Sequence, residues 1–270
     1  MKTNFTKIIA AYVPSKPSKA ALLNARDLAQ RHNASLTILN VNPEKSEFGV
    51  VRKEVDEIMA GSTVNYDLVE REGAPYREIL SIAERTKADL IVMGTHGSTQ
   101  RDPDWIGGNA FKVLSGSTCP VITFTGLHTG IGFKNIVLPI ADASETRQKV
   151  PLAVSLAKAY NATLHIAIVN KNEDKDIVNT LKIYASQAEG YCEEHGVAWT
   201  YTEIYNKNIA DACIEYAKEV NADLIAIMCE RESATGFFMG HYAQKLVNRA
   251  DTAVLTVHIK DTAIVGGTGY

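Results

Sequence analysis

Short apolar runs alternate with longer amphipathic segments along the whole chain. Five apolar runs in the first half predict strands: Lys7–Val13, Ser35–Val41, Thr63–Val69, Ala88–Met93 and Pro120–Phe124. Segments with apolar residues at helical spacing predict helices between them, over Ala20–His32 with Ser18 as N-cap, Val50–Ala60, Pro75–Thr86 and from Asn109 onward. Strict alternation of strands and helices predicts a parallel sheet that is covered by helices on both faces.

The second half of the chain repeats this order. Its strands are predicted at Asn135–Ile140, near Asn161–Leu164, and at Val197–Ile204, Ala222–Ile225 and Ala253–Val257. Its helices are predicted at Ser144–Tyr160, Asp176–His195, Ile209–Val220 and Gly240–Arg249. The tetrapeptide Ala-Asp-Leu-Ile at residues 88–91 recurs at residues 222–225. A repeat of about 130 residues predicts two tandem domains. We place them at residues 1–126 and 133–270, with residues 125–132 as the linker.

Composition narrows the choice of class and compartment. The 270 residues are 46% hydrophobic and 22% charged, as in globular proteins, and each half can bury a core. A net charge of −3 argues against nucleic acid or an anionic membrane as the main partner. No apolar run approaches a membrane span, and Met1–Phe5 lacks a signal-peptide core. We therefore expect a cytoplasmic protein whose cysteines, Cys119, Cys192, Cys213 and Cys229, are buried free thiols.

A group of glycines separates the fourth strand of the first half from the helix that follows it. The residues are Gly94, Gly97, Gly107, Gly108 and Asn109, with the spacing G-x2-G-x9-G-G-N. This spacing is neither that of a P-loop nor the G-x-G-x-x-G of dinucleotide-binding domains. Such a junction offers unpaired N–H groups at the positive end of a helix, which suits a phosphate.

The spacing resembles the G-x2-G-x9-G-[ST] signature of the nucleotide-binding branch of the universal stress protein family, with Gly108 standing where that family has Ser or Thr. The ending Cys119-Pro120-Val121 and the order of elements extend the resemblance to a tandem member along nearly the whole chain. It implies two Rossmann-like domains of the adenine nucleotide alpha hydrolase-like type. Each would be a five-stranded parallel sheet with helices on both faces.

The resemblance also implies where a nucleotide binds. In the family an Asp after the first strand holds adenine; here that position is Val13, which cannot accept the amino hydrogen. The Val41 backbone would contact the nucleotide, and Met93 would line the ribose. The phosphates would meet the backbone of Gly94, Gly97, Gly107, Gly108 and Asn109. The missing hydroxyl at Gly108 removes a donor that contributes about 0.5–1.5 kcal/mol, which Asn109 would replace in part as an N-cap. We expect weak binding of ATP, with Mg²⁺, at this one site.

Other charged residues near the glycines have two readings each. Arg101 and Lys112 either pair with phosphate or lie in solvent. The acidic loop 101–105, which ends in Trp105, either holds a Mg²⁺ ion or is a polar surface loop. His96 either polarises a phosphate or stabilises the backbone. In each case the second reading is the commoner one in proteins.

The second half lacks the glycine loop. Met228 and Arg231 stand in place of the first two glycines, and the larger His241 and Tyr242 open the last helix. Asp142 lies one position beyond the adenine Asp of the family. Cys229, Glu230 and His241 are not at metal-ligand spacing. We therefore expect no ordinary nucleotide site and no metal site in this half.

No hydrolase, metalloprotease or triad motif occurs in the sequence, so we expect a protein that is not an enzyme and has no catalytic residues. Three functions remain open. The first is a stress-response regulator with one nucleotide site and protein partners. The second is a nucleotide-free scaffold whose halves form a pseudo-dimer, with residues 121–124 beside residues 254–257. The third is a slow ATPase. Association into a homodimer is left open.

Overall fold

The computed structural model describes residues 4–42, 48–95, 106–125, 130–140, 144–171, 175–206, 208–229 and 240–258. The first half contains β1 (Lys7–Ala11), α1 (Lys16–His32), β2 (Ser35–Val41), α2 (Phe48–Met59), β3 (Tyr66–Arg71), α3 (Pro75–Thr86), β4 (Leu90–Gly94), α4 (Gly108–Gly116) and β5 (Val121–Phe124). The second half contains β6 (Asn135–Ile140), the 3-10 helix η1 (Ser144–Lys149), α5 (Val150–Tyr160), β7 (Thr163–Asn170), α6 (Lys175–His195), β8 (Trp199–Tyr205), α7 (Ile209–Glu219), β9 (Leu224–Cys229), α8 (His241–Arg249) and β10 (Ala253–His258).

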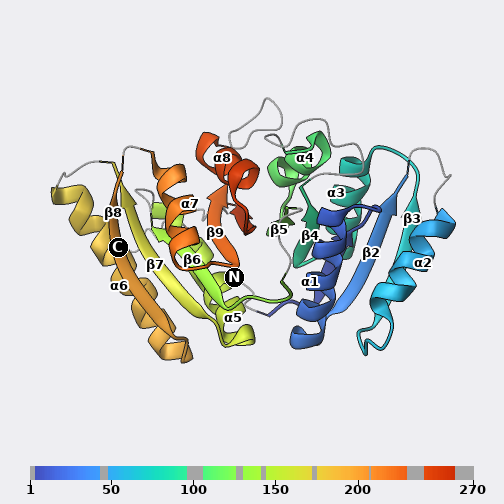
Figure 1. Ribbon diagram of the computed structural model, residues 1–270, viewed down its shortest axis with the longest axis horizontal. Helices are drawn as coiled ribbons and strands as arrows, with labels where there is room; N and C mark the ends of the chain where they lie inside the picture. The colour runs from blue at the N-terminus through green and yellow to red at the C-terminus, as the bar shows by residue number, and fades with distance from the viewer. Residues whose placement is uncertain are drawn as a thin grey trace, which may run out of the picture.

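The two halves form a single sheet with the strand order β3-β2-β1-β4-β5-β10-β9-β6-β7-β8 (Figure 1). Within each half the paired strands are parallel, as the alternation of elements predicts. The halves meet through β5 and β10, which are antiparallel and place Leu255 opposite Ile122. This contact confirms the predicted pairing of the last strands, and it satisfies an edge of each five-stranded sheet.

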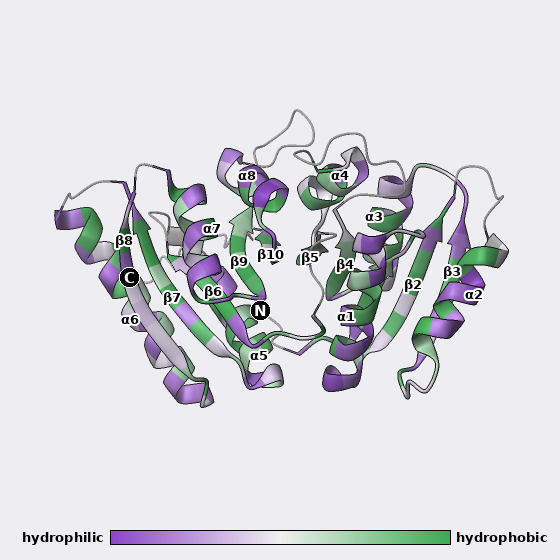
Figure 2. Cartoon of the chain, viewed as in Figure 1, coloured by the Kyte–Doolittle hydropathy of each residue, from purple (hydrophilic) through white to green (hydrophobic). Residues whose placement is uncertain are grey.

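Helices cover both faces of the sheet. The apolar sides of α1, α2, α5 and α6 pack on one face, and those of α3, α4, α7 and α8 pack on the other. Figure 2 shows the central strands as mostly apolar, the outer strands β3 and β8 as more polar, and the helices as two-sided. Each of the two cores contains residues from both halves, so the halves share their hydrophobic interior.

The residues that repeat between the halves have structural roles. Asp89 accepts hydrogen bonds from the backbone N–H groups of Thr6 and Lys7, at 2.8 and 3.0 Å, and so ties the start of β4 to β1. Asp223 does the same for Lys134 and Asn135, at 2.6 and 3.0 Å. Each repeated Asp therefore aligns two strands and belongs to no site.

Helix starts differ most from the prediction. The N-cap of α1 is Ser15 and not Ser18, because the Ser15 hydroxyl accepts the Ser18 N–H at 3.3 Å and Pro17 is compatible with a first turn. The α-helix predicted over Ser144–Tyr160 is wrong in its first six residues, which form η1. Pro151 has no N–H to bond the Arg147 carbonyl, so regular α5 begins only at Val150. Strands β3 and β8 begin two or three residues later than predicted.

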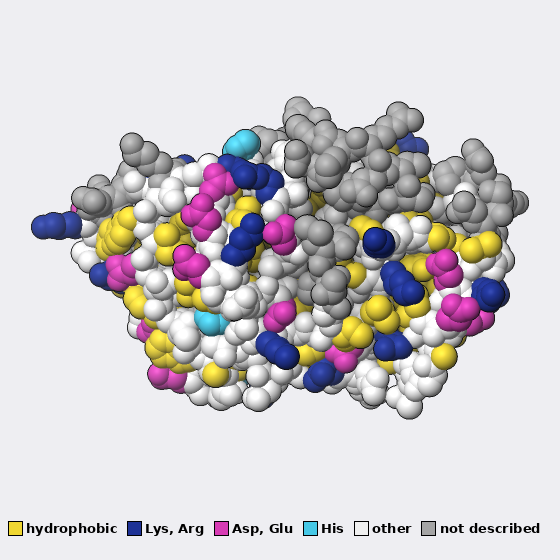
Figure 3. All heavy atoms as spheres, in the orientation of Figure 1, with side chains coloured by type: hydrophobic (Ala, Val, Ile, Leu, Met, Phe, Trp, Pro, Cys, Tyr) yellow, Lys and Arg dark blue, Asp and Glu magenta, His cyan; other side chains and the backbone are white. Residues whose placement is uncertain are grey.

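The surface and the helices limit the range of partners. On the face shown in Figure 3, basic and acidic side chains are intermixed among the described residues, which gives nucleic acid no continuous basic surface there. No helix in the described ranges is long and apolar enough to cross a membrane. The four cysteines are free and buried.

Candidate functional site

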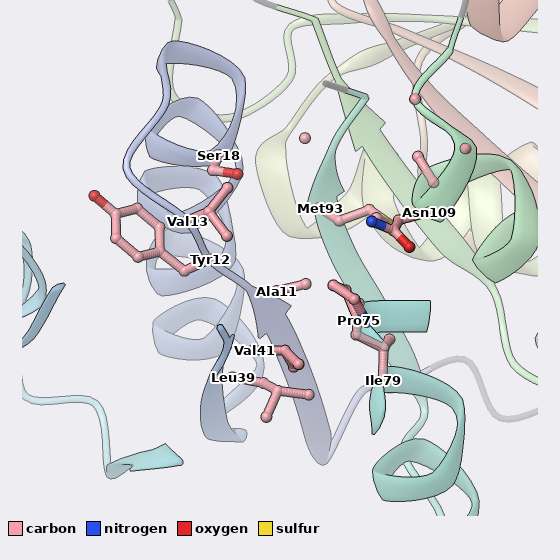
Figure 4. A pocket seen from close by; sticks show the side chains of 14 residues that line it. Ala11, Tyr12, Val13, Ser18, Leu39, Val41, Pro75, Ile79, Met93 and Asn109 are labelled. Carbon is pink, nitrogen blue, oxygen red and sulfur yellow. The ribbon is translucent and has the colours of Figure 1, made fainter. Parts of the chain in front are cut away.

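A pocket of about 260 Å³ opens beside the carboxyl ends of β1 and β4. From β1 the chain runs outward to β2 and β3 and then returns to β4 on the other side, so this is the switch point of the first-half sheet. Ligands of open parallel sheets bind at such a crevice. The pocket is lined by Ala11, Tyr12, Val13, Ser18, Leu39, Val41, Pro75, Ile79, Met93, Gly94, Gly107, Gly108, Asn109 and Ala110 (Figure 4).

The structure brings the described residues of the predicted site together. The residues that line this one pocket include Val13, Val41, Met93, Gly94, Gly107, Gly108 and Asn109. Gly97, His96 and the loop 101–105 lie outside the described residues. Sequence reasoning missed Ser18, Pro75 and Ile79, which come from the starts of two other helices.

Three helix N-termini face the pocket. Ser18 lies in the first turn of α1, Pro75 begins α3, and Gly108 begins α4. Because helix N-termini carry partial positive charge, their convergence favours an anion. In α4 the first intrahelical bond is donated by the Phe111 N–H to the Gly107 carbonyl, at 3.0 Å. Within the described part of the chain, the N–H groups of residues 108–110 have no hydrogen-bond acceptor, so they are available to a ligand.

Two glycines have roles other than the predicted ones. The Gly107 N–H donates to the Thr95 carbonyl at 2.9 Å, so it is not available to a phosphate. Gly107, and not Asn109, is the N-cap of α4. At Gly94 a Cβ atom would lie 2.7 Å from the Ser18 nitrogen and 2.8 Å from the Pro17 carbonyl carbon. Gly94 is therefore needed because α1 approaches β4 closely, and its φ is not positive.

Much of the pocket wall is apolar. Leu39, Val41, Ile79 and Met93 supply it, and no charged side chain lies among the described lining residues. Tyr12 turns its ring away from the pocket in Figure 4, and its hydroxyl donates to Glu54 Oε2 at 2.5 Å. Burial and this carboxylate raise the pKa of the Tyr12 phenol. A flat apolar ligand group would thus meet side-chain carbon and backbone on this wall.

Lys112 is directed elsewhere. Its ammonium lies 4.5 Å from the centre of the Tyr76 ring, and Lys112 does not line the pocket. A cation held over an aromatic face is stabilised there. The reading that pairs Lys112 with a phosphate therefore finds no support in this geometry.

At the corresponding edge of the second half, two of three matched positions carry a larger side chain and the third carries a smaller one. The fifth residue of β4 is Gly94, and the fifth of β9 is Met228. The fifth residue of α3 is Ile79, and the fifth of α7 is Cys213. The second residue of α4 is Asn109, and the second of α8 is Tyr242.

Two of these second-half side chains, Tyr242 and Cys213, contact each other. The Tyr242 hydroxyl lies 3.4 Å from Cys213 Sγ, and both groups have a pKa raised by burial. Lys149 is 3% exposed, and burial lowers the pKa of its amine to about 7, against an opposing effect of the Cys213 thiol. His241, by contrast, is exposed, so Tyr242 alone of the predicted pair fills this edge.

The remaining second-half residues singled out from the sequence are not placed. Asp142, Glu230 and Arg231 lie outside the described residues. Among those described, no group of three or more His, Cys, Asp or Glu side chains could hold a metal ion.

The structure is thus a doubled parallel α/β fold with a pocket at the switch point of its first half, the place where open parallel sheets of other proteins bind ligands. The Universal stress protein family matches residues 50–124 and 132–258, which is most of the chain. The chain belongs to the universal stress protein family and is a tandem member of it.

Individual proteins agree with this assignment. A universal stress protein of Thermus aquaticus is 31% identical over 133 residues, covering 44% of this chain and 97% of that protein. Universal stress protein MJ0531 of Methanocaldococcus jannaschii is 47% identical over 51 residues, but the match spans only 19% of this chain and 30% of that protein. The crystal structure of a universal stress protein from Archaeoglobus fulgidus has a TM-score of 0.75 at 16% identity and covers 94% of this chain and 98% of that one, so the fold is shared over both halves.

Proposed function

We propose that the first half binds a nucleotide or a related phosphate compound, with ATP the expected ligand, and that the protein acts as a stress-response regulator through this one site. The observation that carries the proposal is the set of N–H groups at residues 108–110, which lack acceptors among the described residues and face an apolar-walled pocket. Phosphate would bind at the start of α4, and the base would lie against Val41, Ile79 and Met93.

The lining favours binding over catalysis. The described part of the wall contains no acid, base or nucleophile other than the Ser18 hydroxyl and the Tyr12 phenol, and the Tyr12 side chain points away. A hydrolase needs a group within hydrogen-bond reach of the proton that it moves. Mg²⁺ would need oxygen ligands, and Asp102 and Asp104, which could supply them, lie outside the described residues.

One observation favours the hypothesis of a nucleotide-free scaffold. The antiparallel pairing of β5 with β10 makes the chain an internal pseudo-dimer whether or not a ligand is bound. Protein partners remain a prediction, and association with a second copy is left open. A chain that binds neither nucleotide nor pyrophosphate would have this scaffold role alone.

Gly108 offers a direct test of nucleotide binding. A Cβ at this position meets no atom of the described residues within 4 Å, so they leave room for a side chain, and an acidic residue in the first turn suits the helix. We expect Gly108→Asp to weaken ATP and pyrophosphate binding at least ~10-fold, because a carboxylate would stand beside the bound phosphate. Isothermal titration with and without Mg²⁺ measures this change.

The matched control is Gly108→Ser, which adds the missing hydroxyl in the same open space. It should bind ATP as well as the wild type or up to about 10-fold more tightly, since one further donor contributes about 0.5–1.5 kcal/mol. Equal affinity of the wild type and Gly108→Asp for ATP would refute the proposed phosphate position. Phosphate release by the wild type that Gly108→Asp abolishes would favour the ATPase reading.

Val13 should control the choice of base. With valine there, recognition of a base relies on the apolar wall and the backbone, so we expect ATP and GTP to bind within about fivefold of each other. Val13→Asp supplies an acceptor for the adenine amino group and should raise the preference for ATP about 10-fold. Competition titrations measure the ratio, with Val13→Leu, which is of similar size and has no acceptor, as the control. An unchanged ratio in Val13→Asp would place the base elsewhere.

A further inference from the structure

The turn before α4 is held by the second half of the chain. The backbone N–H of Ile106 donates to Oδ1 of Asn248 on α8 at 2.9 Å, across 142 positions of sequence. The next residue, Gly107, donates its N–H to the Thr95 carbonyl at 2.9 Å, within the first half. The second half thus holds the amide of Ile106, and the first half holds the amide of Gly107. These two residues come directly before residues 108–110, whose N–H groups face the pocket.

The far end of α4 is also fixed by the second half. His258, on β10, donates from Nε2 to the carbonyl of Leu114 in the last turn of α4, and His258 is 5% exposed. In Figure 2, α4 and α8 lie above the central strands β5 and β10. The helix whose start forms the anion end of the pocket is therefore attached at both ends to elements of the other half.

The attachment at Ile106 has consequences for the pocket. Ile106 is 6% exposed and packs in the core that contains Ala243 and Leu246 of α8. A buried N–H without an acceptor is unfavourable, so loss of the Asn248 oxygen would drive the turn to move or to admit water. Because residues 108–110 follow directly, their N–H groups would lose their fixed direction.

We infer that Asn248 is a positioning residue for the first-half anion site, and that the second half, whose own site is filled, sets the geometry of that site through α8. This inference rests on the proposed function for its ligand, but the hydrogen bond that carries it can be measured without one. Since coupling between two sites is reciprocal, a ligand that binds residues 108–110 must also steady the Ile106–Asn248 contact.

The test uses the full chain and two readouts. The first is amide hydrogen exchange at Ile106, followed by NMR without ligand. We expect Asn248→Ala to speed exchange at Ile106 at least ~10-fold, and Asn248→Asp, which keeps an acceptor oxygen, to leave it within about threefold of wild type. Gln244→Ala, one turn earlier on α8, is the matched control and should leave Ile106 unchanged.

The second readout is the affinity for ATP and pyrophosphate. Asn248→Ala should weaken both about 3- to 10-fold, Gln244→Ala should not, and saturating ATP should slow exchange at Ile106 in the wild type. Unchanged exchange in Asn248→Ala overturns the inference while leaving the proposed function intact. Faster exchange with unchanged affinity overturns the positioning role. If the wild type binds neither ATP nor pyrophosphate, the proposed function and the positioning role are both wrong. The exchange data still show whether the Ile106–Asn248 contact between the halves exists.

Discussion

Replacing Gly94 by alanine is expected to lower the free energy of unfolding by about 2–3 kcal/mol. The added Cβ would stand 2.7–2.8 Å from backbone atoms of Pro17 and Ser18, and backbone cannot rotate away as a flexible side chain can. Either β4 or the first turn of α1 must shift, and both lie under tightly packed core residues. Urea denaturation of wild type and variant measures the difference.

Gly108→Ala is the matched control for that experiment. It adds the same methyl group where no atom lies within 4 Å, and alanine favours a helix over glycine. Its stability should equal or exceed that of wild type by up to about 1 kcal/mol. If Gly94→Ala unfolds at the same urea concentration as Gly108→Ala, the close approach of α1 to β4 is not tight in solution.

We expect the free energy of unfolding of the wild type, compared with that of Lys149→Met, to rise as the pH increases above neutrality. Burial lowers the Lys149 pKa from 10.5 to about 7, so between these values the unfolded chain holds a proton that the folded chain lacks. Unfolding then takes up a proton, and the free energy of unfolding increases with pH by up to ~1.4 kcal/mol per unit. Below pH 7 the Lys149 amine is protonated in both the folded and the unfolded chain, so the full cost of burying its charge lowers the free energy of unfolding.

Denaturation of wild type and Lys149→Met at pH 7, 8 and 9 tests this dependence. We expect the advantage of the methionine variant to shrink by about 2 kcal/mol from pH 7 to pH 9. Lys19→Met, at an exposed position on α1, should show no such trend. A pH-independent difference for Lys149→Met would mean that the amine reaches solvent or keeps its proton when the protein is folded.

Much of the fold could be predicted because its signals are local. Apolar runs and helical spacing lie within single elements, and they gave the order of strands and helices in both halves. The repeated Asp89 and Asp223 marked the duplication, and each accepts hydrogen bonds at the start of the first strand of its own half. The contact of β5 with β10 was predicted from the resemblance to the family and is present in the structure.

What could not be predicted depends on contacts between distant segments. No residue near Gly94 in the sequence indicates that the start of α1 packs closely against it. Ligand binding was therefore the natural explanation for a glycine at this position. Ser18 and Pro75 join the pocket only because parallel strands bring helix starts to one edge. Lys149 and Cys213 influence each other electrostatically across 64 positions, and no local signal in the sequence indicates that Lys149 is buried. The start of α5 was misjudged because periodicity continued through Pro151.

The antiparallel junction of β5 and β10 has a consequence for how such a chain can evolve. Two separate subunits that met there would dissociate on dilution, whereas halves on one polypeptide cannot part while the chain remains folded. One half can then lose its ancestral pocket and still be retained as a permanent companion of the other. The contact between β5 and β10 should accordingly survive a thousandfold dilution of the protein.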